Sequence, residues 1–152
     1  MIDRKISISK INSPALGSLA ARIAIAAILF PHGAQKLLGW WGGLGYQGSM
    51  AYFTGTVGLP YIIGLLVIMI EFIAPIFLIL GFFTRLSAVA VLIVMAGIVV
   101  CVQNQYFFMN WFGTQKGEGM EFFLLMMGLC LVCILNGGGP FALDRRLTDV
   151  NY

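Results

Sequence analysis

The chain alternates between long apolar runs and short polar segments. The four apolar runs are Leu16–Leu38, Pro60–Phe83, Leu86–Val102 and Met120–Asn136. A helix that crosses a lipid bilayer needs about 20 mostly apolar residues, within a range of roughly 17–25. Each run reaches or approaches that length, and none shows the two-residue alternation of a barrel strand. The pattern predicts an all-α integral membrane protein with four transmembrane helices.

The predicted helices cover about residues 16–38, 60–83, 86–106 and 120–136. They form a four-helix bundle within a single transmembrane domain, residues 1–152. The first apolar run is longer than the core of a secretory signal peptide, which has about 7–15 residues. We therefore expect it to be retained as the first helix of the bundle.

The composition supports lipid as the solvent of this chain. Hydrophobic residues make up 60% of the sequence and charged residues only 10%. Soluble domains carry about 45–50% apolar and about 25% charged residues. With a net charge of +3 and few cations, the chain has no basic patch of the kind that binds nucleic acid.

The basic residues predict an orientation. Six of them would share one side of the membrane: Arg4, Lys5, Lys10, Arg85, Arg145 and Arg146. The other side would hold Lys36 and Lys116. The positive-inside rule then puts both termini in the cytoplasm. The two glycine- and aromatic-containing loops, about 39–59 and 107–119, are expected to be structured and to face outward.

The stretch PHGAQKLLGWWGGLG holds the chain's single histidine, His32. Lys36 follows it by one helical turn, so both side chains can face one pocket. Imidazole exchanges protons near neutral pH, and an ammonium group can stabilise a developing oxyanion. Gln35 lies between them. The alternative is an ordinary turn at the membrane interface.

Three further charged residues are candidates for a site. Glu71, near the middle of the second helix, should face the bundle interior or a cavity because a carboxylate in lipid is costly. Arg22, in the first helix, would pair with Glu71 or snorkel to the headgroups. Glu121 would complement the dipole of the fourth helix or act as an acid near His32. Lys116 and Glu118 are expected to be solvated.

The aromatic residues of the loops have two interpretations. Trp40, Trp41 and Trp111 suit the headgroup zone, where such rings concentrate, and this is the simpler interpretation. Alternatively, they stack on a ligand ring, with Asn110 beside Trp111.

Cys130 and Cys133 form a CxxC inside an apolar helix, where we expect packing rather than the redox chemistry of a helix N-terminus. A redox role for them stays open. One histidine and scattered thiols give no tetrahedral metal set, so no metal site is predicted.

These motifs together resemble the DoxX family from about Ala21 to Arg146. The resemblance rests on HGAQK with GGLG, Glu71, Thr84–Arg85, FFMNW, GEGMEF and the closing GGGPFALDR. It implies a small multi-pass protein of the bacterial or archaeal cytoplasmic (inner) membrane that is associated with oxidoreductase systems. Relatives form the membrane subunit of thiosulfate:quinone oxidoreductase.

The leading hypothesis is a quinone-interacting subunit that works with a partner oxidoreductase, with quinone as the cofactor and no evident bound prosthetic group. The candidate catalytic residues are His32, Lys36, Glu71 and Glu121. The candidate ligand-binding residues are Gln35, Trp40, Trp41, Asn110, Trp111 and Arg22. One alternative is a non-catalytic anchor or assembly subunit, whose helices pack within the bundle or between copies in a homo-oligomer. Another is a small-molecule binder or transporter that uses Glu71 and Arg22. Enzymatic activity of the chain alone is left open.

Overall fold

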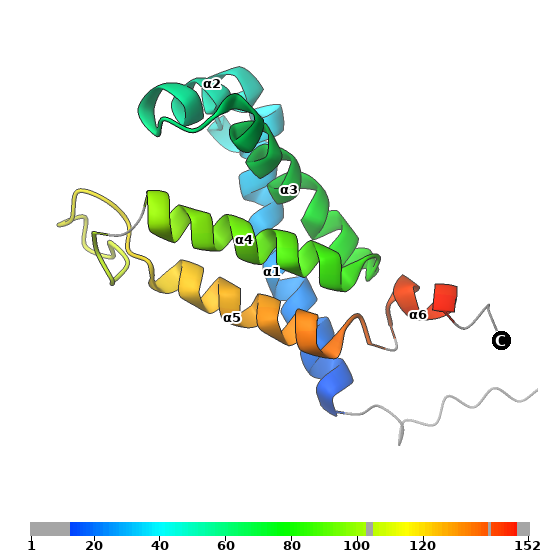
Figure 1. Ribbon diagram of the computed structural model, residues 1–152. Helices are drawn as coiled ribbons and strands as arrows, with labels where there is room; N and C mark the ends of the chain where they lie inside the picture. Colours follow the sequence, from blue (N-terminus) through cyan, green and yellow to red (C-terminus); the bar gives the residue numbers. More distant parts are fainter. Residues whose placement is uncertain (1–12, 103–104, 140, 149–152) are drawn as a thin grey trace, which may run out of the picture.

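The computed structural model describes residues 13–102, 105–139 and 141–148. Helices dominate it, and this part of the chain contains no strand, which confirms the all-α prediction. Figure 1 shows the elements in chain order. They are α1 (Ser13–Leu38), η2 (Trp40–Gly42), α2 (Gly45–Ala51), the π-helical turn η3 (Tyr52–Thr56), α3 (Tyr61–Leu80), α4 (Thr84–Cys101), α5 (Glu121–Asn136) and α6 (Leu143–Thr148).

Three of the described helices are long and apolar enough to cross a membrane: α1, α3 and α4. Helix α5 is also apolar but has 16 residues, which corresponds to about 24 Å of helix against about 30 Å of bilayer hydrocarbon. The chain is therefore a multi-pass membrane protein, and a fourth crossing by α5 stays a prediction. Arg4, Lys5 and Lys10 lie outside the described residues, so the orientation of the termini also stays a prediction.

The helix boundaries differ from the predicted ones where the backbone turns. The second long helix ends at Leu80 instead of 83, because Gly81 adopts a left-handed φ of 66° and ends it as a C-cap. Helix α4 then begins at Thr84, directly after Phe83 with a φ of 46°. It ends at Cys101 rather than 106. Residues 103 and 104 of the predicted helix lie outside the described part.

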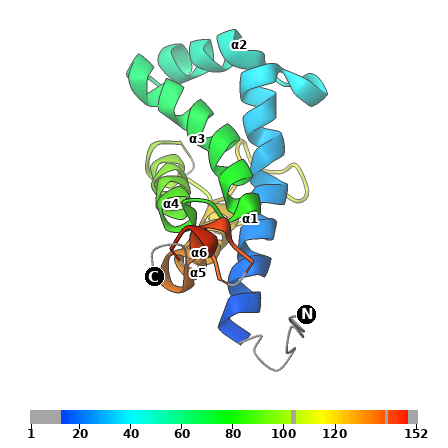
Figure 2. The same ribbon diagram turned by 90° about the vertical axis from the view of Figure 1, so that its right-hand side faces the viewer.

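The long helices form two pairs, α1 with α3 and α4 with α5, and the pairs pack on each other through α1–α5 and α3–α4 contacts. Figures 1 and 2 show that the α2–η3 segment covers the ends of α1 and α3, while residues 105–120 extend from the ends of α4 and α5 at a separate corner. The buried core between the pairs includes Ile25, Leu78, Val91, Met126 and Cys130.

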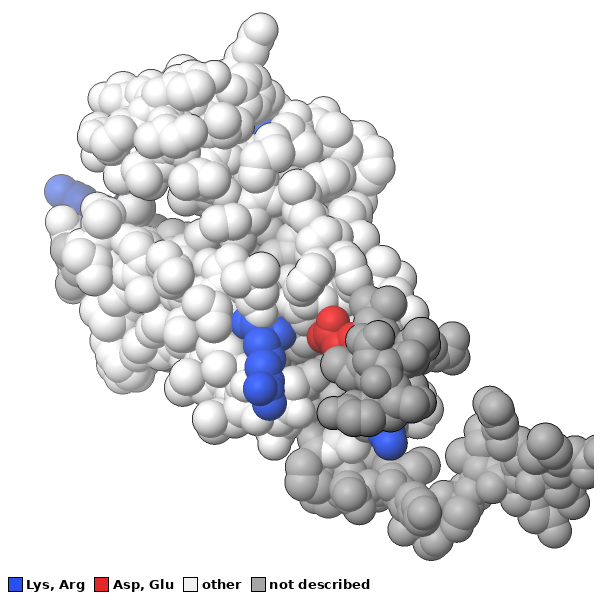
Figure 3. Space-filling view, turned by 45° about the vertical axis from the view of Figure 1, so that its right-hand side comes forward, with Lys and Arg blue, Asp and Glu red and all other residues white. Residues whose placement is uncertain are grey.

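The outer surface of the helices is apolar. Large side chains on it are exposed along α3, α4 and α5, including Leu66, Leu86, Ile93, Leu125 and Leu135. The face in Figure 3 carries few charges, and its acidic group lies beside basic ones toward the lower end. Lipid solvates such a surface, whereas water would not.

The α3–α4 turn is tied to the C-terminal helix α6. Asp144 accepts hydrogen bonds from the backbone N–H groups of Phe83 (2.7 Å) and Thr84 (2.9 Å), while its own N–H donates to the Gly81 carbonyl (2.9 Å). The Asp144 carboxylate thus caps the N-terminus of α4, which favours negative charge. The chain directly after α5 is tied to α1, because the Ser18 hydroxyl donates a hydrogen bond to the Gly137 carbonyl.

Arg22 is completely buried at this end of the bundle. A Cβ at Gly81 would overlap the guanidinium, so the side chain packs directly under the α3–α4 turn. The prediction that Arg22 snorkels to the headgroups is therefore wrong, because the side chain is completely buried beneath the α3–α4 turn.

We expect Asp144→Ala to lower the free energy of unfolding by about 0.5–2 kcal/mol, the usual effect of losing a helix cap. Asp144→Asn should lose less, since the amide oxygen still accepts one of the two bonds. Thermal unfolding followed by circular dichroism in detergent micelles measures both. Equal melting temperatures for Asp144→Ala and the natural chain would contradict the capping role.

Candidate functional site

The site begins where α1 crosses α3. A Cβ atom at Gly33 would overlap the backbone carbonyl of Glu71 and approach the N–H of Phe72. Ala34, the next residue on α1, is completely buried. Small residues allow such close approach of helix backbones in membranes. The crossing therefore brings the neighbours of Gly33 on α1 against the middle of α3.

Lys36 and Glu71 form an ion pair at this crossing. The ammonium Nζ of Lys36 donates to Oε2 of Glu71, whose side chain is 2% exposed against 29% for that of Lys36. A carboxylate taken out of water needs such a partner. The predicted Arg22–Glu71 pair is wrong: Arg22 lies about four helical turns earlier on α1, and Lys36, one turn beyond Gly33, is the cation that reaches Glu71.

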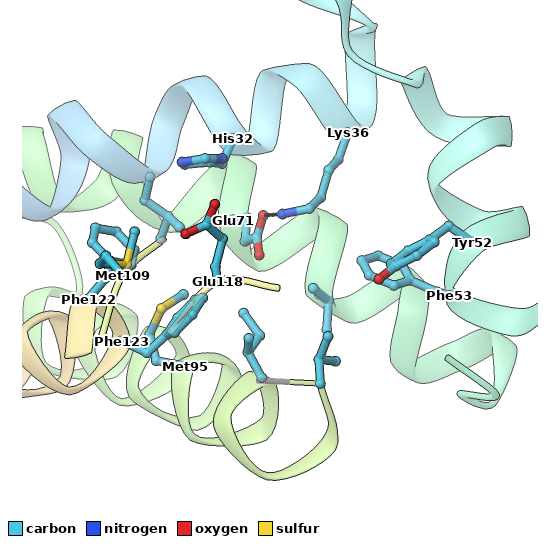
Figure 4. A pocket seen from close by; sticks show the side chains of 14 residues that line it. His32, Lys36, Tyr52, Phe53, Glu71, Met95, Met109, Glu118, Phe122 and Phe123 are labelled. Atoms are coloured by element: carbon cyan, nitrogen blue, oxygen red, sulfur yellow. Dashed lines mark hydrogen bonds and ion pairs between the residues drawn. The ribbon is translucent and has the colours of Figure 1, made fainter. Parts of the chain in front are cut away.

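A cavity of about 350 Å³ opens beside this pair. His32, Lys36 and Glu71 supply its polar side, and apolar or aromatic side chains supply most of the remaining wall (Figure 4). These come from α1, η3, α3, α4, the residue directly after α4, the 105–120 segment and α5: Leu29, Tyr52, Phe53, Val67, Met95, Ile98, Val102, Met109, Phe122 and Phe123. The cavity thus combines a polar end with walls that suit an apolar ring.

Glu118 is a cavity residue that the sequence analysis missed. The prediction that it is solvated is confirmed by its exposure, and it also lines the cavity, where its carboxylate points toward His32 (Figure 4). Its Oε2 accepts a hydrogen bond from the backbone N–H of Asn110 (3.1 Å). Gly119, whose Cβ would overlap the Phe108 carbonyl, lets the segment fold back on itself. The glycine on either side of Glu118 was the only sequence signal of that fold.

Glu121 lies near the cavity without lining it. Its Oε1 accepts a hydrogen bond from the backbone N–H of Met109 (3.0 Å), and its own N–H donates to the Phe107 carbonyl (3.0 Å). The carboxylate therefore ties the 105–120 segment to the start of α5. This contact gives Glu121 a structural role next to the site.

Asn110 and Trp111 also lie off the cavity. The Asn110 side chain donates to the Gln115 carbonyl (3.0 Å) and accepts from the Gln115 N–H (3.1 Å), which closes the turn between them. Trp111 is 78% exposed. Neither residue is among those that line the cavity.

Trp40 and Trp41 pack edge to face against each other, with ring centroids 5.5 Å apart, and neither lines the cavity. Gln35 lines a second cavity of about 340 Å³, which shares Lys36, Tyr52 and Phe53 with the first. This second cavity lies against η2 and α2.

Two contacts hold the segment that covers this end of α1. A Cβ at Gly43 would overlap the backbone of Gln35, so the glycine-rich turn lies directly on the helix. The hydroxyls of Tyr46 and Tyr61 hydrogen-bond to each other, which links α2 to the start of α3 and raises the pKa of the Tyr46 phenol.

The described residues contain no cluster of three metal-ligating side chains. Cys130 and Cys133 are free thiols that are completely buried in the core. Their position agrees with packing against the helices around them.

The DoxX family model matches residues 17–104 of the chain, which cover α1 to α4. The chain belongs to the DoxX family. It is 30% identical over 131 residues to the inner membrane protein YphA of Escherichia coli, covering 84% of this chain and 88% of YphA. The name of this relative gives it as an inner membrane protein of that bacterium, and the three helices of this chain that can cross a membrane agree with a multi-pass membrane protein.

A second relative is the Bacillus subtilis protein named "Putative oxidoreductase CatD". The two are 26% identical over 129 residues, and the match covers 85% of each chain. A comparison with solved structures gives no significant match.

Gly33→Ala tests the helix crossing. We expect it to lower the melting temperature because the added methyl group overlaps the Glu71 backbone. Gly97→Ala on α4 is the matched control, since a Cβ there meets nothing within 4 Å. Alanine favours helix over glycine by about 0.5–1 kcal/mol, so the control should be neutral or stabilised. A Gly33→Ala protein as stable as the control would contradict close contact at the crossing.

Lys36→Met and Glu71→Gln test the ion pair. Each single change should lower the free energy of unfolding, and the double change should cost less than the two single losses together. We expect a coupling free energy of about 0.5–3 kcal/mol, as for other residues in contact. Denaturant titrations of the four proteins in micelles measure it. Simple additivity would show that the pair contributes nothing to stability.

Proposed function

We propose that the chain is a quinone-interacting subunit of a membrane oxidoreductase system. The observation that carries this proposal is the Lys36–Glu71 pair with His32 at one end of an apolar cavity. A quinone has a flat apolar ring with two carbonyl oxygens, which accept hydrogen bonds. It therefore needs both kinds of surface in one site.

The cavity suits a quinone ring in size and chemistry. Its volume of about 350 Å³ lies in the range of about 300–1,000 Å³ that is usual for small-molecule sites. Phe122 and Phe123 provide aromatic wall, and His32 and Lys36 provide donors for a carbonyl oxygen. The ion pair with Glu71 holds the Lys36 side chain beside the cavity.

The redox role rests on general chemistry and on the named relative. Reduction of a quinone takes up two electrons and two protons. In this proposal the electrons come from the flavin or metal centre of a partner oxidoreductase, and residues of this chain exchange the protons. The name of the Bacillus subtilis relative supports an oxidoreductase system. Trp40, Trp41, Trp111 and Arg22 are left out of the proposed site, because they do not line the cavity.

A non-catalytic anchor for a partner protein is the second candidate. Exposed aromatic side chains of the 105–120 segment favour it: Phe107, Phe108, Trp111 and Phe112. Such an anchor would hold a partner without binding quinone, so the binding experiment below separates the two candidates.

Ile98→Trp tests quinone binding in the cavity. Ile98 lines the cavity, so a tryptophan there should fill the space and weaken binding of decylubiquinone by about tenfold or more, which is about 1.4 kcal/mol. The matched control is Ile93→Trp on the same helix, at a side chain that is 65% exposed. Calorimetric titration of the proteins in lipid nanodiscs measures the affinities.

Circular dichroism checks that both tryptophan variants fold. Saturable binding that is lost in Ile98→Trp and kept in Ile93→Trp supports the proposal. No saturable binding to the natural chain, or equal affinities for the two variants, would overturn it.

A further inference from the structure

Glu118 lines the cavity, but the proposed function assigns it no role. We propose that its carboxylate exchanges protons between the cavity and the water outside the membrane. This inference rests on the proposed function, because it assigns a route to the protons of the bound quinone.

Glu118 differs from the other ionisable residues of the cavity in the element that carries it. His32 and Lys36 come from α1 and Glu71 comes from α3, which are both membrane-spanning helices. Glu118 belongs to the 105–120 segment between α4 and α5. It is the one carboxylate among the described residues that both lines the cavity and lies outside the long helices.

The other elements around Glu118 bring no competing charge to the cavity. Helix α4 contributes Met95 and Ile98, Val102 follows directly after α4, and α5 contributes Phe122 and Phe123. From η3 come Tyr52 and Phe53. The charged or titratable groups that face Glu118 across the cavity are therefore His32, Lys36 and Glu71, together with the Tyr52 phenol.

Exposure and orientation fit a group that connects two environments. Glu118 is exposed at the surface of its segment, and its carboxylate points toward His32 (Figure 4). The Asn110 N–H holds Oε2 in that position. Glu71, in contrast, is almost completely buried and paired with Lys36. A proton that reaches Glu118 can pass to water directly.

Oxidation of a bound quinol releases two electrons and two protons. The two electrons leave to the partner's flavin or metal centre, and two phenolic O–H bonds break. Each proton passes to the His32 imidazole, then to the Glu118 carboxylate, directly or through one water, and then to bulk water. Reduction of a quinone runs the same transfers in the opposite direction.

The test uses 2-hydroxy-1,4-naphthoquinone, a quinone whose acidic hydroxyl changes its absorbance on losing a proton. The full chain in lipid nanodiscs binds the probe, and a stopped-flow pH jump reports how fast the bound probe changes protonation. We expect Glu118→Gln to slow this rate by about tenfold or more when both proteins are saturated with the probe. Glu118→Asp should recover much of the rate, because a carboxylate is restored.

Glu121→Gln is the matched control. It removes the other carboxylate of the same region, which does not line the cavity, and its amide oxygen can still accept from the Met109 N–H. In this variant, the bound probe should change protonation at the same rate as in the natural chain.

The outcomes separate the two proposals. A natural rate in Glu118→Gln, or equal slowing in Glu121→Gln, overturns the relay while the quinone site stands. A large loss of affinity in Glu118→Gln assigns the residue to binding and also overturns it. If the natural chain does not bind the probe or decylubiquinone, the proposed function itself fails.

Discussion

Where α1 crosses α3, the backbone of Gly33 lies against the carbonyl of Glu71 with no space for a methyl group. That contact sets the register of the two helices. One turn further along α1, Lys36 then meets the Glu71 side chain and neutralises it inside the bundle. His32, one residue earlier than Gly33, lines the adjoining cavity. The polar end of the site thus depends on a single residue without a side chain.

The membrane setting explains why the polar groups gather in one place. Lipid solvates the apolar outer faces of the helices, so hydrophobic burial alone does not hold the helix pairs together. Close packing and polar contacts must contribute instead. One set lies at the Lys36–Glu71 pair in the middle of α3, and another ties Asp144 to the start of α4, close to the C-terminal end of α3. Between the pairs, the cavity takes its walls from all four long helices.

The helices were predictable because each depends on local properties of the chain. A run of about 20 apolar residues dictates a helix in lipid, where backbone groups have no other partners. The boundaries were less predictable. The end of α3 depends on the left-handed backbone of Gly81 and Phe83. The apolar run continues through Phe82 and Phe83, so hydrophobicity alone does not indicate where the helix ends. The 39–59 loop was expected to be structured, with a short interfacial helix or a re-entrant element, and the structure gives it the short helix α2 and the π-helical turn η3.

The site was predictable in part. The spacing of His32 and Lys36 on one helical face and the cost of a carboxylate at Glu71 pointed to residues that do line one cavity. The choice of partner for Glu71 was not predictable, because Arg22 and Lys36 are both cations on α1. Depth along the helix was compatible with Arg22, and the crossing at Gly33 favoured Lys36.

By itself, the sequence determined that this chain is helical and lies in a membrane. The composition and the length of the apolar runs are enough for that, because both are local properties of the chain. Only the tertiary structure decided that Lys36 pairs with Glu71, that Arg22 is buried under the α3–α4 turn, and that Glu118 rather than Glu121 lines the cavity. These outcomes depend on how closely distant segments approach, which no local pattern encodes.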